Sequence, residues 1–134
     1  MSNQYQIGVV VGSLRSDSYN KKVANALIKL FPSHFTFKFI DISELPLYNQ
    51  DADQHVPTTV AQFKSQISQC DGIIFVTPEY NRSIPGVLKN AIDQAPARGV
   101  IIHGMANLLV YLAFQSVTSV QQLHNSTCAI AWHF

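Results

Sequence analysis

The sequence predicts an α/β protein built on a doubly wound parallel sheet. Three short runs rich in β-forming residues, at 6–11, 35–40 and 73–76, alternate with segments whose apolar residues recur at helical spacing. Strands that alternate with amphipathic helices are typical of parallel sheets, because the crossover helices cover both faces of the sheet. Polar residues gather just after the first and third runs. Ligands bind beyond the carboxyl ends of the strands in such sheets, so we expect these two polar segments to share one crevice.

The first half of the chain is expected to form a strand, a helix and a second strand. The strand at 6–11 is short, β-branched and ends at Gly12. The next segment, 21–31, carries apolar residues at helical spacing, and Pro32 ends the expected helix. The run at 35–40 alternates apolar and polar residues, which predicts the second strand.

The second half continues with a loop, a helix, a strand and a further helix. The loop at 41–54 is a candidate cleft wall, and Pro57 is expected to open the next helix in its first turn. The third strand, 73–76, is followed by a loop at 77–86 and a helix at 87–92. The expected cleft wall consists of Leu45, Leu47 and Tyr48, and the expected buried helix face consists of Val60, Phe63, Ile67 and Cys70.

Composition predicts one globular domain that binds neither nucleic acid nor a membrane. The 134 residues suffice for one core, and the net charge is only +1. No cluster of Lys and Arg exceeds a pair, and no apolar run reaches the roughly 18 residues of a membrane span. The N-terminus lacks a signal-peptide pattern, and Cys70 and Cys128 are isolated. We therefore expect a cytoplasmic protein with free thiols and no metal site.

The segment at 12–20 has the composition of an anion-binding loop. It joins a strand to a helix N-terminus, where the first backbone N–H groups have no partner inside the helix and attract anions. Ser13, Ser18 and Asn20 can donate neutral hydrogen bonds, and Arg15 adds a positive charge. The segment matches neither a dinucleotide-binding fingerprint nor an NTPase P-loop, so a single phosphate group is the first interpretation. The alternative is an ordinary capped loop between a strand and a helix.

The loop after the third strand combines Pro78, Glu79, Tyr80 and Asn81. A rigid proline, a flat ring and two hydrogen-bonding side chains could bind the edge of a flat heterocycle. The alternatives are that the Tyr80 ring packs on the sheet edge and that Glu79 is solvated or caps the helix after Pro85.

The two loops together resemble the NADPH-dependent FMN reductase family. The resemblance rests on G-S-L-R-x-x-S-x-N at 12–20 and T-P-E-Y-N-x-S-x-P-G-x-L-K-N-A-I-D at 77–93, and it covers residues 4 to about 95. It implies a flavodoxin-like fold, and FMN as the cofactor with NADPH or NADH as co-substrate. It also implies reduction of small-molecule acceptors, namely quinones, free flavin or metal oxyanions, by a homodimer or homotetramer.

The resemblance also implies which residues hold FMN. Ser13, Arg15, Ser18 and Asn20 would hold its phosphate, whereas Pro78, Glu79, Tyr80 and Asn81 would line the ribityl chain and the ring. No side chain is expected to be catalytic in its own right, because the flavin carries the chemistry. The sequence agrees, since it contains no G-x-S-x-G, no H-E-x-x-H and no paired-carboxylate motif, and its five histidines are scattered.

The sequence departs from the family pattern after residue 95, which divides it into a flavodoxin-like part, 1–95, and a tail, 96–134. The tail contains no acidic residue and one basic residue, Arg98. Among the synonymous codons that the genetic code allows for residues 95–107, one choice read one base out of register would encode S-R-P-W-G-Y-N-S-W-H-G-K. Those for 116–134 permit V-G-H-I-G-T-A-V-A-Q-Q-H-L-R-N-S-L-A-F. Both strings resemble the family's continuation, which indicates a frameshift.

A frameshifted tail would truncate the sheet after the third strand and the helix that follows it, and would remove a third flavin-contacting loop. The third strand would then have an uncovered edge, although the apolar stretch at 108–114 could pair as a makeshift strand or helix. The chain could in that case be a binding-only or inactive fragment. The alternative is a divergent C-terminus that completes the sheet.

Overall fold

The computed structural model describes residues 4–95 and 110–114, which form a four-stranded sheet and its covering helices. The strands are β1 (Tyr5–Val11), β2 (Phe35–Phe39), β3 (Gly72–Pro78) and β4 (Val110–Phe114). The helices are α1 (Tyr19–Ile28), the 3-10 helix η1 (Gln50–Gln54), α2 (Thr58–Ser68) and α3 (Gly86–Gln94).

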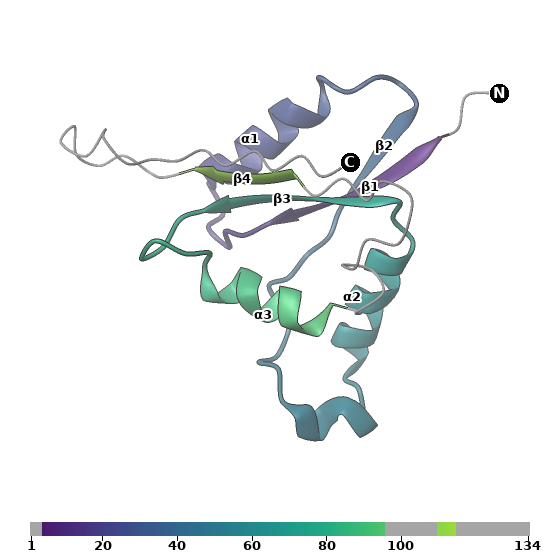
Figure 1. Ribbon diagram of the computed structural model, residues 1–134, viewed down its shortest axis with the longest axis vertical. Helices are drawn as coiled ribbons and strands as arrows, with labels where there is room; N and C mark the ends of the chain where they lie inside the picture. Colours follow the sequence, from purple (N-terminus) through teal and green to yellow (C-terminus); the bar gives the residue numbers. More distant parts are fainter. Residues whose placement is uncertain (1–3, 96–109, 115–134) are drawn as a thin grey trace.

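The sheet is parallel throughout and has the strand order β2-β1-β3-β4. β1 lies in the interior, where Val9 is in register with Phe39 of β2 and with Ile74 of β3. Helix α1 covers one face of the sheet, and α2 and α3 cover the other (Figure 1). The predicted doubly wound parallel sheet is therefore confirmed.

Each face of the sheet has its own hydrophobic core, because successive side chains of a strand point to opposite faces. Val9 and Ile74 belong to the core under α1, whereas their neighbours Val10 and Ile73 belong to the core under α2 and α3. The α1 core comprises Ile7, Val9, Ala24, Ile74 and Val76, and the other core comprises Val10, Ile40, Ile42, Phe63, Ile67, Ile73, Leu88 and Ala91. Continuous burial explains why the centres of β1 and β3 are nearly unbroken apolar runs, whereas β2, which is less buried, alternates apolar and polar residues.

The helix boundaries differ from the predicted ones by a few residues. α1 begins at Tyr19 rather than residue 21, because Ser18 is the N-cap and its side-chain oxygen accepts a hydrogen bond of 3.4 Å from the Lys21 N–H. It ends at Ile28, three residues before the predicted end. Pro57 lies just before the first residue of α2 rather than in its first turn. The buried face of α2 is as predicted for its helical residues.

The sheet does not end after the third strand, which corrects the predicted truncation at this edge. Val110–Phe114 pairs in parallel with β3, from Ile74 opposite Val110 to Pro78 opposite Phe114. The segment reads Val-Tyr-Leu-Ala-Phe, and β-branched and aromatic residues suit a strand beside an unpaired edge. The edge of β3 is therefore covered, as the apolar stretch at 108–114 allowed. The rest of the predicted tail, 96–109 and 115–134, lies outside the described residues.

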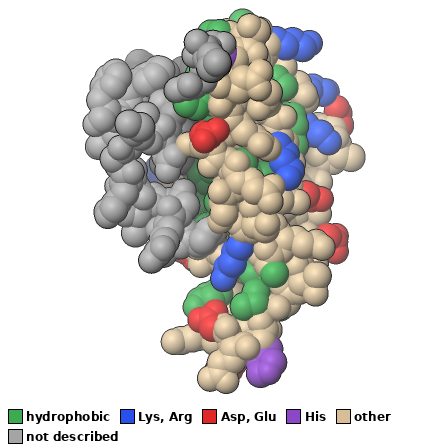
Figure 2. All heavy atoms as spheres, turned by 90° about the vertical axis from the view of Figure 1, so that its right-hand side faces the viewer, with side chains coloured by type: hydrophobic (Ala, Val, Ile, Leu, Met, Phe, Trp, Pro, Cys, Tyr) green, Lys and Arg blue, Asp and Glu red, His purple; other side chains and the backbone are tan. Residues whose placement is uncertain are grey.

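Within the described residues no helix is long and apolar enough to cross a membrane. On the face that Figure 2 draws, basic and acidic side chains are interspersed rather than segregated. Cys70 is half-buried, where its thiol donates to the Gln66 carbonyl oxygen at 3.2 Å and burial raises its pKa. A raised pKa keeps this thiol protonated at neutral pH, which fits a structural cysteine.

Candidate functional site

The loops after β1 and β3 begin side by side at the carboxyl edge of the sheet. The Gly12 N–H donates to the Val76 carbonyl oxygen at 2.9 Å, which joins the end of β1 to β3. A methyl group at Gly12 would lie 2.7 Å from Thr77 Cβ and closer still to Thr77 Oγ1. Thr77 is fully buried and donates its hydroxyl to the Pro78 carbonyl oxygen at 3.0 Å. Only a glycine therefore fits where the first loop leaves the sheet.

The loop after β1 ends in two buried polar residues at the start of α1. Ser18 is 3% exposed and Asn20 is 7% exposed, although both are polar. Ser18 caps the helix, whereas Asn20 Oδ1 has no hydrogen-bond partner among the described residues. A buried polar atom without a partner is costly and calls for an explanation such as an absent ligand. Ser13 is half-buried and Arg15 is exposed.

The loop after β3 makes a tight turn that presents Tyr80 and Asn81. Tyr80 and Ser83 exchange two backbone hydrogen bonds, of 2.8 and 3.0 Å. The two central residues have positive φ, 51° for Asn81 and 62° for Arg82, which is the backbone of a type I′ turn. Asparagine tolerates this conformation better than most residues.

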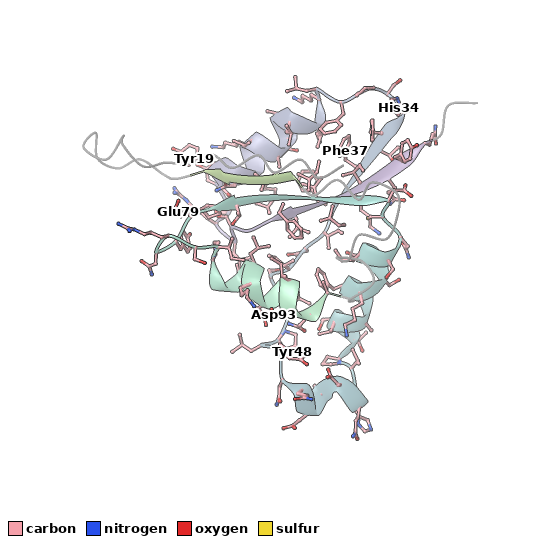
Figure 3. The ribbon with its side chains drawn as sticks, in the orientation of Figure 1. Tyr19, His34, Phe37, Tyr48, Glu79 and Asp93 are labelled. Carbon is pink, nitrogen blue, oxygen red and sulfur yellow. The ribbon has the colours of Figure 1, made fainter. Side chains whose placement is uncertain are left out.

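The structure contradicts two of the three alternatives for this loop, whereas a solvated Glu79 stays open because Glu79 is only half-buried. Tyr80 is 57% exposed, so it is not packed on the sheet edge. No side chain caps α3, so Glu79 does not cap it. Glu79 lies at the same edge as Tyr19, the first residue of α1 (Figure 3). Pro78 is the last residue of β3 and is buried.

A cavity of about 370 Å³ lies between the loops after β1 and β2, and we call it the β1–β2 cavity. Its walls come from Val11, from residues 13–16, from Lys21 and from residues 39–43. Ser13 and Arg15 line it, but residues 78–81 do not. The predicted residues are thus at one edge, but only Ser13 and Arg15 belong to this cavity.

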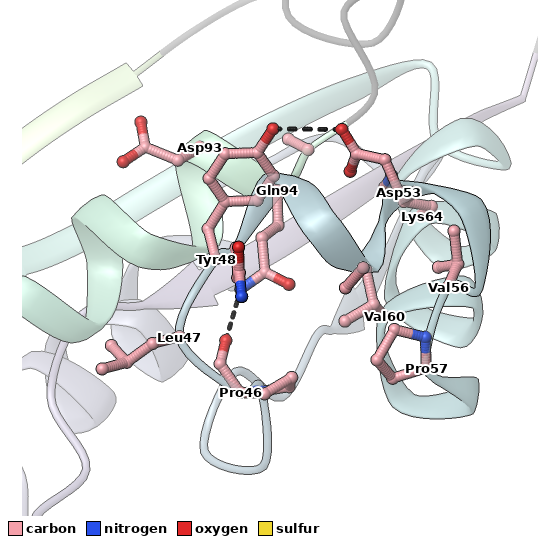
Figure 4. Close-up of a pocket in the computed structure, with 13 residues that line it drawn as sticks. Pro46, Leu47, Tyr48, Asp53, Val56, Pro57, Val60, Lys64, Asp93 and Gln94 are labelled. Carbon is pink, nitrogen blue, oxygen red and sulfur yellow. Dashed lines mark hydrogen bonds between the residues drawn. The ribbon is translucent and has the colours of Figure 1, made fainter.

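A second cavity, of about 290 Å³, lies between the loop at 46–49, η1, α2 and α3 (Figure 4). Two amides anchor its wall: Asn90 Nδ2 and Gln94 Nε2 donate to the Pro46 carbonyl oxygen at 2.9 and 2.7 Å. The predicted wall residues Leu47 and Tyr48 line this cavity, whereas Leu45 packs against the hydrophobic core instead. The sequence interpretation missed Asn90 and Gln94.

Asp53→Asn should lower the pKa of Tyr48 towards its ordinary value. The Tyr48 hydroxyl donates to Asp53 Oδ2 at 3.2 Å, and the negative charge of Asp53 is the main cause that raises the Tyr48 pKa. Without that charge, tyrosinate forms at lower pH. Alkaline ultraviolet titration, taken as a difference against Tyr48→Phe, measures the shift. Asp51→Asn in the same 3-10 helix is the control, and equal titrations of the two variants would contradict the assignment.

Comparison with known proteins identifies the family. A sequence model of the NADPH-dependent FMN reductases matches residues 5–130, so the match extends beyond residue 95, where the predicted resemblance ends. The chain belongs to this family. It is 60% identical over 90 residues to a 2-hydroxy-1,4-benzoquinone reductase from Burkholderia sp, a match that covers 67% of this chain and 49% of that protein. It is 54% identical over 94 residues to a quinone reductase from Pseudomonas putida, which covers 69% and 50%.

The similar solved structures support the fold. The flavoenzyme FerB, an NAD(P)H:(acceptor) oxidoreductase from Paracoccus denitrificans, has a TM-score of 0.68 at 35% identity, over 87% of this chain and 63% of that one. The flavodoxin-like fold predicted from the two motifs is therefore confirmed. The chain spans about half the length of the curated relatives that it matches.

Proposed function

We propose that this protein is a flavoprotein that reduces a small-molecule acceptor with electrons from NADPH or NADH. The proposal rests on one observation. Both family motifs meet at one edge of the sheet, where the buried Asn20 amide oxygen has no hydrogen-bond partner among the described residues. Quinones are the acceptor class that the names of the relatives favour, with free flavin and metal oxyanions as further candidates.

The residues at this edge fit FMN. Ser13, Arg15, Ser18 and Asn20 would hold its phosphate beside the N-terminus of α1, where backbone N–H groups favour an anion. A 180° rotation of the Asn20 amide would place its N–H group where the partnerless oxygen now lies. The exposed turn with Pro78, Glu79, Tyr80 and Asn81 would line the ribityl chain and the ring.

Bound FMN would supply the hydride-transfer chemistry between NAD(P)H and the acceptor. The chain's own residues would bind and orient the cofactor, and none would take or give a proton. The type I′ turn at 80–83 fixes the backbone beside the ring site, so that its groups need no rearrangement on binding.

A titration of the full chain with FMN tests the proposal. Saturable, one-to-one quenching of flavin fluorescence would support it, and soluble protein that leaves the fluorescence unchanged would refute it. NADPH oxidation with a quinone acceptor then distinguishes an active reductase from the alternative, a binding-only or inactive flavodoxin-like fragment.

We further propose that residues 96–134 are a frameshift product joined to a flavodoxin-like part at 1–95. The out-of-register strings of the tail resemble the family's continuation, which the genomic sequence can test directly. The proposal is supported if a second reading frame, shifted by one base, continues the family sequence without a stop codon from near the Ala95 codon. It is refuted if the gene contains no such frame. By family resemblance we also propose that the protein is cytoplasmic and forms a homodimer or homotetramer. Sedimentation analysis tests the oligomeric state.

A further inference from the structure

The β1–β2 cavity carries one positive charge, that of Lys21, beyond the Arg15 charge that the proposed flavin site uses. Lys21 lines it from the first turn of α1, and Arg15 lines it from the loop after β1. Within the described residues neither side chain has an ion-pair partner, whereas the neighbouring Lys22 is paired with Asp17. Two unpaired cations facing one concave space are suited to an anionic group with more than one negative charge.

Neutral donors accompany the two cations. Ser13, Ser16 and Ser43 line the same cavity. Its one acidic residue, Asp41, accepts a hydrogen bond of 2.9 Å from the Ser43 N–H, and this bond is the main cause that lowers the Asp41 pKa. Asp41 is therefore ionised at neutral pH and leaves a net charge of about +1 on the three charged groups. That balance still favours an anion, and a carboxylate can accept a bond from a sugar hydroxyl.

The cavity also has an apolar side that a bare anion would not need. Phe39 and Leu14 line it, and they are 41% and 54% exposed. Exposed aromatic and aliphatic side chains beside a charged pocket offer a surface on which a flat base can stack. The volume of about 370 Å³ lies within the usual range for small-molecule sites, roughly 300–1,000 Å³.

We propose that the β1–β2 cavity binds the phosphorylated adenosine half of the nicotinamide co-substrate. Lys21 contacts a phosphate group, and Phe39 and Leu14 contact the base. The inference rests on the proposed function, since it assigns a place to the NADPH or NADH of that reaction. The phosphate is either the 2′-phosphate that only NADPH carries or the pyrophosphate that both co-substrates share.

Calorimetric titration of the full chain with adenosine 2′,5′-bisphosphate and with ADP tests the site without any turnover. We expect saturable binding of at least one of them, and the tighter ligand identifies the 2′-phosphate or the pyrophosphate as the source. Lys21→Ala should weaken that binding at least about tenfold, the usual effect of a lost charge-assisted contact. Lys22→Ala is the matched control. Lys22 carries the same charge at the next position in the chain, but its side chain pairs with Asp17 and does not line the cavity.

Phe39→Ala is a second, independent variant. It should weaken adenosine 2′,5′-bisphosphate binding by at least about fivefold, through lost base stacking, and leave inorganic phosphate binding unchanged. Equal effects of Lys21→Ala and Lys22→Ala, or no binding of either nucleotide, would overturn the proposal. Displacement of the bound nucleotide by FMN, one for one, would also overturn it and assign the cavity to the flavin phosphate. FMN binding measured on the same sample shows separately whether the proposed function holds.

Discussion

Gly12→Ala should lower the free energy of unfolding by about 1–3 kcal/mol, the usual cost of forcing an extra methyl group into a packed site. The new methyl group would collide with Cβ and Oγ1 of Thr77, which is fully buried and cannot move aside into solvent. The collision would push the loop after β1 away from β3, although the Gly12 N–H holds the two together. We therefore expect weaker FMN binding as well as lower stability. Denaturant unfolding and FMN titration of the same variant measure both effects.

Gly86→Ala is the matched control for this prediction. Gly86 is the first residue of α3, and a methyl group there would meet nothing within 4 Å. Because alanine is favoured over glycine in a helix, this variant should be neutral or more stable by up to about 1 kcal/mol. In the double variant Gly12→Ala/Thr77→Ala the contact with Oγ1 is gone, so part of the lost stability should return. Equal stabilities of the two glycine variants would show that the close approach at Gly12 has no energetic consequence.

Strands β1 and β3 could be predicted from the sequence because their central residues are buried on both faces of the sheet. Val9 and Val10 belong to different cores, so their run is apolar at consecutive positions and stands out in the sequence. The start of α1 was less visible, because the apolar pattern of the helix begins only at Val23. The side chain of Ser18 sets that start, and such a cap depends on one local hydrogen bond rather than on a repeating pattern.

The fourth strand shows the limit of prediction from a single sequence. The apolar residues of Val110–Phe114 indicated a strand or a helix, and nothing local decided between them. The choice depends on the edge of β3, which offers a row of unpaired backbone groups only once the first three strands have assembled. Strand pairing across more than thirty residues of sequence is a tertiary effect.

The candidate site was predictable only in part, for a similar reason. The two loops carry their signal in consecutive residues, such as Tyr80 and Asn81 in the turn. Asn90 and Gln94, which anchor the wall of the second cavity, lie on α3, and isolated amide side chains on a helix are usually expected to face solvent. They bond the carbonyl oxygen of Pro46, more than forty residues away. The β1–β2 cavity likewise requires β2 to lie beside β1, which the strand order decides.

Arg15→Ala should weaken FMN binding by about 1.5–3 kcal/mol, the usual contribution of a hydrogen bond to a charged group. Arg15 is exposed on the loop after β1 and has no ion-pair partner among the described residues, so its charge is available to a phosphate. The phosphate has two negative charges near neutral pH, and loss of the guanidinium removes a planar donor that lysine would not replace. Fluorescence titration with FMN at fixed ionic strength measures the change.

Lys29→Ala separates a contact from a general loss of charge. Lys29 follows the last residue of α1, so it lies about 15 Å from the phosphate loop at 1.5 Å per residue. That distance exceeds the Debye length of about 8 Å at physiological salt, and the variant should bind FMN as the parent chain does. Arg15 also lines the β1–β2 cavity, which allows a sharper test. If Arg15→Ala weakened adenosine 2′,5′-bisphosphate binding but left FMN affinity unchanged, Arg15 would belong to the nucleotide site and the flavin phosphate would depend on Ser18, Asn20 and the helix N-terminus.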